Sequence, residues 1–332
     1  MNYRVAFAGF RHPHIFSLWT RILEHPHCEI VGAWENNPAM RETLKSAGEI
    51  ALTHDSFTQM LKETECNVVA IGDAYGRRGA LAIQALESGC HVISDKPICI
   101  SLDELKQISE LAKERKLSVG CQLDLVETGV IRRLQETIRS GHLGEVKTVS
   151  IFAQHPLRYG VRPSWYFEPG QHGGTINDIG IHVFHLMPWL TGSKWKGIHY
   201  ARSWNAKARE EKHFQDCAQF VGELENGVSC FTDVSYLAPN TLGFEASQYW
   251  RITAHGTRGV AETSYNAKTV EIITDEDKEP RHLAGIDGAV ITYLQDFLDE
   301  IAGKQADGGL TTSEVLDISH WALETQAKSE GK

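Results

Sequence analysis

Short apolar runs alternate with helical patterns over the first 120 residues of the chain. Residues 3–8 form an apolar run that ends at Gly9, and apolar side chains then recur at helical spacing from Ile15 to Leu23. Such a run predicts a buried strand, and such a repeat predicts a helix. The alternation continues with strands expected at 29–34, 67–71, 91–94 and 117–121, and helices at 38–46, at 78–88 and from Ser101. Repeated strand–helix units predict a parallel sheet with helices on both faces.

The pattern changes beyond about residue 122, where strand-like segments become dominant. Short turns such as residues 225–227 join consecutive segments, which favours antiparallel pairing. The expected strands are 146–153, 197–204, 215–224, 228–236, 248–254, 258–263 and 268–273, with helices at 127–140, 175–191, 293–301 and 312–328. This half of the chain therefore predicts a second domain of a different class.

Composition narrows the class of protein. A length of 332 residues with 42% hydrophobic side chains suggests about two domains. The 33 Lys and Arg against 43 Asp and Glu give a net charge of -10 without a basic stripe, so we expect no nucleic-acid partner. No apolar stretch approaches the roughly 18 residues that span a bilayer, and the seven scattered cysteines contain no CxxC pair. We expect a cytoplasmic protein with reduced thiols and no membrane partner.

The turn after the first strand is a candidate dinucleotide site. In a doubly wound sheet the pyrophosphate lies at the start of the first helix, where free amides and the helix dipole favour anions. The expected cofactor-binding residues here are Gly9, Phe10, Arg11, His12 and His14. Arg11 and His14 replace the second and third glycines of the usual fingerprint, so the motif alone is weak, and a sheet that serves only as scaffold is the alternative. The Arg11 guanidinium could instead bind phosphate directly.

Glu35 follows the second strand, 26 residues after Gly9. An acidic side chain at this place accepts hydrogen bonds from the adenosine ribose and repels a 2′-phosphate, so NAD is favoured over NADP. Arg11 and Arg41 could offset that repulsion, and a solvated loop acid is the alternative interpretation of Glu35. Asp73 and Lys96 complete the expected cofactor-binding set.

Lys96 lies in an Asp-Lys-Pro segment that directly follows the strand at 91–94. It therefore stands at the carboxyl end of a strand, where sheets of this type bind their ligands. Most lysines are solvated surface charges, but this one stands among apolar residues, and the proline restricts the local turn. We therefore take Lys96 as a candidate for both substrate binding and catalysis.

A second cluster lies at the start of the helix expected at 175–191. Asp178, His182 and His185 would share one helix face, because they are spaced i, i+4 and i+7. A carboxylate and an imidazole, together with a lysine, can remove a hydroxyl proton as hydride leaves the same carbon. We expect no metal, although the same three residues could ligate a divalent ion instead. The alternative is that both histidines only pack the helix against its neighbours and take no part in the chemistry.

Two motifs resemble the Gfo/Idh/MocA oxidoreductases, a family named after glucose–fructose oxidoreductase, inositol dehydrogenase and a rhizopine-catabolism protein. Residues 95–97 are similar to the family's Glu-Lys-Pro, and residues 173–182 are similar to its Gly-Gly-x-x-x-Asp-x-Gly-x-His. Supporting stretches make the likeness span nearly the whole chain: 85–92, 140–146 and 256–259. The resemblance implies an α/β N-terminal Rossmann domain at 1–121 with a doubly wound parallel sheet. It also implies an α+β C-terminal domain at 122–332 with an open, mostly antiparallel sheet, whose last helices can pack back on the first domain.

The resemblance also implies roles for three residues and a set of partners. His182 would be the general acid/base on the reacting hydroxyl, Lys96 would polarise its oxygen, and Asp178 would orient substrate or imidazole. The cofactor would be NAD, with NADP possible, and the substrate a small sugar or polyol. A homodimer or homotetramer would form on the open sheet.

Four departures from the family pattern concern the cofactor and the substrate. They are the degenerate glycine loop, residues 72–76 in place of Thr-Pro-Asn-x-x-His, His185 in place of a second Asp, and Gln122-x-Asp124 in place of an Asn and an Arg. The last suggests a substrate unlike glucose or inositol. The expected substrate-binding set is Lys96, Gln122, Tyr166, Asp178, His182 and His185.

The expected function is an NAD(P)-dependent dehydrogenase or reductase that acts on CH–OH groups. One alternative is a redox-neutral glycosidase or lyase, in which bound NAD oxidises a sugar carbon transiently. Another is a sensor that binds the cofactor without catalysis, although a sensor needs no general base. Net consumption of cofactor distinguishes the first from the other two.

Overall fold

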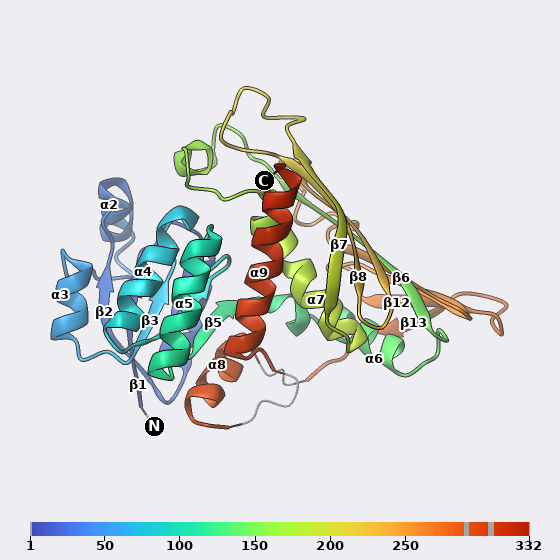
Figure 1. Ribbon diagram of the computed structural model, residues 1–332, viewed down its shortest axis with the longest axis horizontal. Coiled ribbons are helices and arrows are strands. Elements are labelled where there is room, and N and C mark those ends of the chain that lie inside the picture. Colours follow the sequence, from blue (N-terminus) through green and yellow to red (C-terminus); the bar gives the residue numbers. More distant parts are fainter. Residues whose placement is uncertain (1, 289–291, 305–308, 332) are drawn as a thin grey trace. The chain divides into compact units, whose positions relative to one another are not determined.

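The computed structural model describes residues 2–288, 292–304 and 309–331. The chain divides into two compact units (Figure 1). The first unit comprises Met1–Gln122, Gly170–Gly173 and Thr292–His320, and the second comprises Leu123–Pro169, Gly174–Ile291 and Trp321–Lys332. No helix within the described ranges is long and apolar enough to cross a membrane.

The first unit is built on a five-stranded parallel sheet with the order β2-β1-β3-β4-β5, which confirms the predicted Rossmann class. The strands are β1 (Tyr3–Ala8), β2 (Cys28–Trp34), β3 (Val68–Ile71), β4 (His91–Asp95) and β5 (Val119–Gln122). The helices are α1 (His14–Glu24), α2 (Pro38–Ala47), α3 (Phe57–Glu63), α4 (Tyr75–Glu87), α5 (Leu102–Arg115) and α8 (Tyr293–Ile301). Because the strand order reverses after β2, right-handed crossovers put α1 on one face of the sheet and α4 and α5 on the other.

Local chemistry explains where these helices begin and end. Asn37 caps α2 by accepting a hydrogen bond from the Met40 amide, and Gly48 ends that helix in the left-handed conformation. Ser101 caps α5, as its sequence position predicts, by accepting from the amides of Asp103 and Glu104. These caps satisfy amides that a helix leaves without partners at its first turn.

The second unit contains an eight-stranded, mostly antiparallel sheet in the order β13-β12-β11-β10-β6-β9-β8-β7, which confirms the predicted class of the second domain. Only β6 and β9 pair in parallel among its described strands. The strands are β6 (Val146–Pro156), β7 (Trp195–Trp204), β8 (Cys217–Leu224), β9 (Ser229–Ala238), β10 (Arg251–Gly256), β11 (Gly259–Thr263), β12 (Thr269–Thr274) and β13 (Arg281–Ala284). The remaining elements of this unit are η1 (Asp124–Glu127), α6 (Gly129–Arg139), η2 (Ser164–Phe167), η3 (Ile176–Gly180) and α7 (Ile181–Thr191). Helix α9 (Thr312–Ser329) belongs to the first unit up to His320 and to the second from Trp321.

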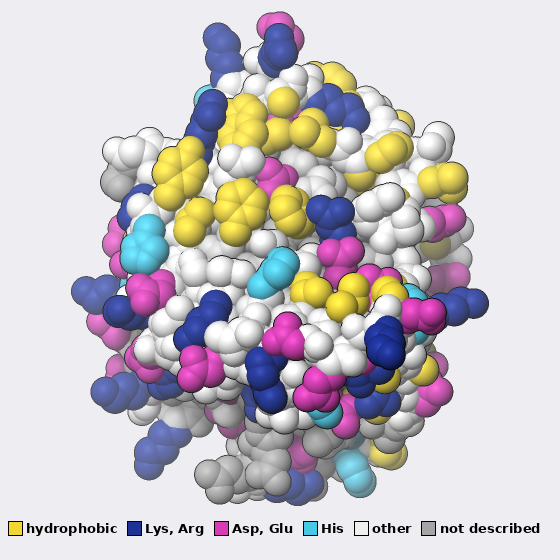
Figure 2. Space-filling model, turned by 90° about the vertical axis from the view of Figure 1, so that its right-hand side faces the viewer, with side chains coloured by type: hydrophobic (Ala, Val, Ile, Leu, Met, Phe, Trp, Pro, Cys, Tyr) yellow, Lys and Arg dark blue, Asp and Glu magenta, His cyan; other side chains and the backbone are white. Residues whose placement is uncertain are grey.

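One face of this sheet is buried and the other is open. Along β6, Val149, Ile151 and Ala153 are buried, whereas the residues between them are half-exposed. On β9, Phe231 and Leu237 point to the open side and are 42% and 47% exposed. Figure 2 shows hydrophobic side chains gathered between charged ones on the side of the molecule to which the open face belongs. Successive side chains along a strand point to opposite faces of the sheet, so alternating apolar and polar residues give one buried face and one open face.

The helix expected at 175–191 differs from the prediction in its first part. Residues Ile176–Gly180 form the π-helix η3, and the regular helix α7 begins only at Ile181. Such π segments are rare and often occur at functional sites. Asp178 lies in η3, whereas His182 and His185 lie in α7, so ideal α-helical spacing does not relate the carboxylate to the two imidazoles.

Candidate active site

A glycine is required where β1 leads into the loop before α1. Gly9 has a φ of +82°, and a Cβ there would lie 2.6 Å from the Cβ of Asp73. The amides of Arg11 and His12 both donate to the carbonyl oxygen of Gly72, at 2.9 and 3.1 Å. The loop is thus tied to the end of β3, and these two amides are used within the protein.

Glu35 is fully buried at the end of β2 and holds the same loop. Its Oε2 accepts from the Phe10 amide and its Oε1 from the Asn37 amide, each at 2.7 Å. Burial raises the pKa of the Glu35 carboxyl, and these two amides oppose the rise. A carboxylate has about four acceptor positions, so two accepted bonds leave capacity for a further donor such as a ribose hydroxyl.

The segment that carries Lys96 is held by Arg78, a fully buried residue of α4. The Arg78 Nη1 donates to the carbonyl oxygens of Asp95, Lys96 and Pro97 at 2.8, 2.6 and 3.1 Å. Its Nη2 donates to Asp95 Oδ2 at 2.9 Å, and its Nε donates to the Asp73 carbonyl at 2.7 Å. One guanidinium therefore fixes the backbone on both sides of Lys96, which is itself 2% exposed.

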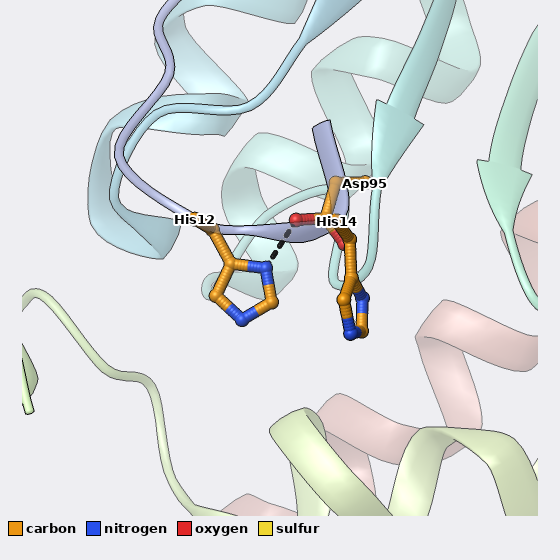
Figure 3. A group of neighbouring side chains, drawn as sticks. All are labelled: His12, His14 and Asp95. Atoms are coloured by element: carbon orange, nitrogen blue, oxygen red, sulfur yellow. Dashed lines mark hydrogen bonds and ion pairs between the residues drawn. The ribbon is translucent and has the colours of Figure 1, made fainter. Parts of the chain in front are cut away.

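Asp95 also contacts two histidines, His12 in the loop before α1 and His14 at the first position of that helix (Figure 3). His12 Nδ1 lies 2.5 Å from Asp95 Oδ2, His14 Nδ1 lies 3.2 Å from Asp95 Oδ1, and His12 Nε2 lies 3.1 Å from the Tyr75 hydroxyl. Burial lowers the pKa of His12 to about 3, although the Asp95 carboxylate opposes this effect. Burial alone would raise the pKa of Asp95, but Arg78 and the two histidines hold it well below its usual range. Asp95 is therefore ionised and the His12 ring neutral at pH 7.

Gln122 ends β5 and pairs with Asp95 across the sheet. It is 1% exposed, and its Oε1 has no hydrogen-bond partner among the residues that the structure describes. A buried carbonyl without a donor is unfavourable. A bound group with an N–H or O–H would therefore be stabilised at this atom. The Asp73 carboxylate, by contrast, already has hydrogen-bond partners. It accepts from the Ala74 amide at 2.7 Å and from the Arg77 Nε at 2.8 Å.

In the second unit Asp178 is buried and accepts a hydrogen bond from the hydroxyl of Tyr236 on β9. The pattern of the sequence did not identify Tyr236, because only the fold brings β9 against η3. The guanidinium carbon of Arg162 lies 5.1 Å from the centre of the Tyr236 ring and 4.5 Å from that of Tyr166. This end of the second unit therefore combines a carboxylate, two phenols and a cation.

His182 and His185 are both buried in α7, at 5% and 8% exposure. The His182 ring meets that of Trp250 edge-on at 5.4 Å. Burial lowers the pKa of His185 to about 4, so this ring is neutral at pH 7. Tyr166, the remaining expected substrate residue, is 2% exposed and lies 4.1 Å from the Trp165 ring.

The structure thus groups the expected residues by unit. The first unit brings together Gly9, Phe10, Arg11, His12, His14, Glu35, Asp73, Lys96 and Gln122 around the carboxyl ends of its strands. The second unit contains Tyr166, Asp178, His182 and His185. A turn that only glycine fits, an acidic residue that ends β2 and a buried acceptor at the end of β5 all fit a dinucleotide across these strand ends. These features define a Rossmann-type dinucleotide-binding protein with a second, sheet-based domain.

Comparison with known families agrees with this class. Residues 4–122 match the oxidoreductase family with an NAD-binding Rossmann fold, and residues 131–262 match the GFO/IDH/MocA C-terminal domain. The chain belongs to the Gfo/Idh/MocA family of oxidoreductases, which confirms the resemblance seen in its motifs. The cofactor class of its first domain is accordingly NAD.

Individual relatives are distant in sequence. The chain is 24% identical over 300 residues to the rhizopine catabolism protein MocA of Rhizobium meliloti, with 89% of this chain and 87% of the relative covered. It is 26% identical over 327 residues to the D-glucoside 3-dehydrogenase of Escherichia coli, with 91% and 90% covered. The match covers only 46% and 62% of two uncharacterised oxidoreductases, from Synechocystis and Schizosaccharomyces pombe. A Thermotoga maritima structure titled a putative oxidoreductase shares the fold, with a TM-score of 0.83, 21% identity and 99% and 98% of the two chains covered.

Proposed function

We propose that this protein is an NAD-dependent dehydrogenase or reductase that transfers hydride between the cofactor and a CH–OH or C=O carbon of a sugar, polyol or similar small molecule. The observation that carries the proposal is Lys96, a buried cation whose backbone Arg78 fixes at the end of β4. Ligands of open α/β sheets bind at these strand ends. The D-glucoside 3-dehydrogenase relative has an activity of the same class.

Three residues would share the chemistry. When bound, NAD accepts the hydride from the carbon that bears the reacting hydroxyl. Lys96 would donate a hydrogen bond to the oxygen and stabilise its negative charge, and His182 would take the hydroxyl proton. Asp178, which accepts from Tyr236, would bind a neighbouring substrate hydroxyl or orient the imidazole. In the reverse direction His182 returns the proton to the alkoxide.

The side chains around β2 support NAD over NADP. Glu35 is fixed at the end of β2 by two amide hydrogen bonds, and its carboxylate would repel a 2′-phosphate. Arg41 could have offset this repulsion, but its guanidinium donates to the Glu35 carbonyl at 2.8 Å and to Asp55 Oδ1 at 2.6 Å. Because the Arg11 and His12 amides are used internally, side chains such as Arg11 would supply much of the pyrophosphate binding.

The test begins with titration of the purified full-length chain with NAD(H) and NADP(H), followed by a screen of sugars and polyols for a change in NADH absorbance. His182→Asn should abolish turnover and leave NAD binding intact, and Lys96→Met should also abolish turnover. Lys106→Met, at an exposed position of α5, should change neither turnover nor NAD binding. Conversion of a substrate with cofactor unchanged would favour a redox-neutral lyase. Absence of binding by either cofactor would refute the proposal.

We also propose that the open face of the eight-stranded sheet mediates a homodimer or homotetramer. A groove on this face is lined by Phe152, Gln154, Asp233, Ser235, Leu237, Gln248 and Arg251. The side chains of β9 beside it include the exposed Phe231, and clustered exposed apolar residues favour association. Light scattering of the purified chain measures the assembly, and a monomer at all concentrations would refute this proposal.

A further inference from the structure

Three side chains in the first unit have the chemistry of metal ligands and lie together (Figure 3). One ligand atom from each of His12, His14 and Asp95 lies within 4.8 Å of the other two. Among the described residues, His12, His14 and Asp95 are the one set of three or more His, Cys, Asp or Glu side chains whose ligand atoms lie this close together. Asp178, His182 and His185 do not form such a set. The sequence did not suggest it, because 83 positions separate His12 from Asp95.

We propose that His12, His14 and Asp95 bind one divalent transition-metal ion of the zinc class. Two imidazole nitrogens and one carboxylate form the donor set that zinc takes when it keeps a position open for water or another ligand. Magnesium and calcium prefer oxygen ligands alone, so they fit this set poorly.

The separations of the ligand atoms fit one ion with little movement. Two ligand atoms on a tetrahedral zinc ion, each about 2.0–2.2 Å from it, lie about 3.3–3.5 Å apart. His14 Nδ1 and Asp95 Oδ1 are 3.2 Å apart, close to that spacing. His12 Nδ1 is 2.5 Å from Asp95 Oδ2, so binding of the ion to this nitrogen has to replace this hydrogen bond.

The surroundings hold the ligands and leave one side accessible. The Tyr75 hydroxyl lies 3.1 Å from His12 Nε2, so it can accept from that nitrogen while Nδ1 faces the ion. Such second contacts fix the ring orientation of metal-bound histidines. The His12 and Asp95 side chains are 7% and 0% exposed, whereas that of His14 is 42% exposed and gives an ion a route from solvent.

The Arg78 cation is the main opposing influence, because it neutralises Asp95 before an ion arrives. Its Nη2 binds Oδ2 at 2.9 Å, so it leaves Oδ1, the oxygen next to His14, for the ion. Because the charges of Asp95 and Arg78 cancel, a bound divalent ion would give the cluster two uncompensated positive charges. Anionic dinucleotide phosphates beside the loop would compensate these charges. Zinc and NAD should therefore bind cooperatively, each raising the affinity for the other by the same factor.

The experiment uses the full-length chain after removal of metals with a chelator, with Zn²⁺ and Co²⁺ added singly. Calorimetry and elemental analysis should give one ion per chain, and bound Co²⁺ should show the intense visible absorption of a four-coordinate site. His14→Ala, at a half-exposed position, should weaken binding at least 100-fold. Asp95→Asn should do the same.

The matched control is His27→Ala, since His25 and His27 form a surface histidine pair with rings 5.9 Å apart. This variant should bind Zn²⁺ like the parent protein. Absence of stoichiometric binding, binding that survives His14→Ala, or binding lost in His27→Ala would each overturn the metal site. NAD titration in the same preparations keeps this result separate from the proposed function, because a chain that binds NAD but no zinc refutes only the metal site.

Discussion

Replacement of Arg78 by methionine tests how strongly the Lys96 segment depends on one buried cation. The change preserves much of the apolar stem but removes the donors to Asp95 Oδ2 and to four backbone carbonyls. Asp95 would remain buried at 0% exposure without its guanidinium partner. Removing one member of a buried ion pair costs about 3–5 kcal/mol. Since a domain is stable by about 5–15 kcal/mol, Arg78→Met should remove a large share of the free energy of unfolding.

Urea unfolding followed by circular dichroism measures this loss, and Arg4 provides the matched control. Arg4 also binds a carboxylate, Glu29, at 3.0 Å and two backbone carbonyls, but its side chain is 39% exposed and the Glu29 side chain 63%. Arg4→Met should therefore cost about 1 kcal/mol or less, because water screens exposed pairs. Equal losses in the two variants would refute the reasoning.

A double variant separates the charge from the hydrogen bonds. In Arg78→Met, the added change Asp95→Asn removes the unpaired buried carboxylate. It should thus recover part of the stability, and the two changes should not be additive. If Asp95→Asn instead adds its full cost to that of Arg78→Met, the ion pair is not the source of the effect.

Three further changes test other parts of the structure. His185 has a folded pKa of about 4 against 6.5 for the free residue, so its unfolded form binds more protons between these values and stability should fall as pH drops from about 6.5 to 4. His185→Gln should flatten the dependence of Tm on pH in that window. Glu35→Ser should raise NADP affinity relative to NAD in the cofactor titration. Phe231→Glu should shift light scattering toward the monomer, whereas Leu23→Glu, at a 66% exposed position on α1, should not.

Sequence periodicity predicted the elements that bury a long apolar run or stripe, and it missed a short helix and an edge strand. All five strands of the parallel sheet were expected within one or two residues of their observed bounds. The helix Phe57–Glu63 has seven residues, too few to establish a repeat, and it was missed. Strand Arg281–Ala284 was also missed, since it lies at the sheet edge and has no buried residue. Edge strands lack the apolar signal on which such predictions depend.

Site residues that belong to local motifs could be predicted from the sequence, whereas the residues that hold them in place could not. Lys96 and Asp178 stand in recognisable segments, and both are buried. Arg78 stands in the segment Gly-Arg-Arg-Gly, where neither arginine is distinguished by sequence alone, yet one is fully buried and the other forms a half-exposed pair with Asp73. Tyr236 meets Asp178 only because β9 lies against η3. Contacts of this kind depend on tertiary packing, which periodicity does not encode.

One departure from the family pattern and one residue of a matching motif form a single structural feature. The loop replaces its third glycine with His14, and the family's Glu-Lys-Pro becomes Asp-Lys-Pro, changes that the sequence presents as independent. In the structure His12 and His14 both contact the Asp95 carboxylate, so the loop and the end of β4 form one polar cluster. A longer glutamate at this position would push its carboxylate further toward the two imidazoles. The histidines and the shorter acid therefore depend on each other, and substitution of either side alone should disturb the cofactor loop more than substitution of both.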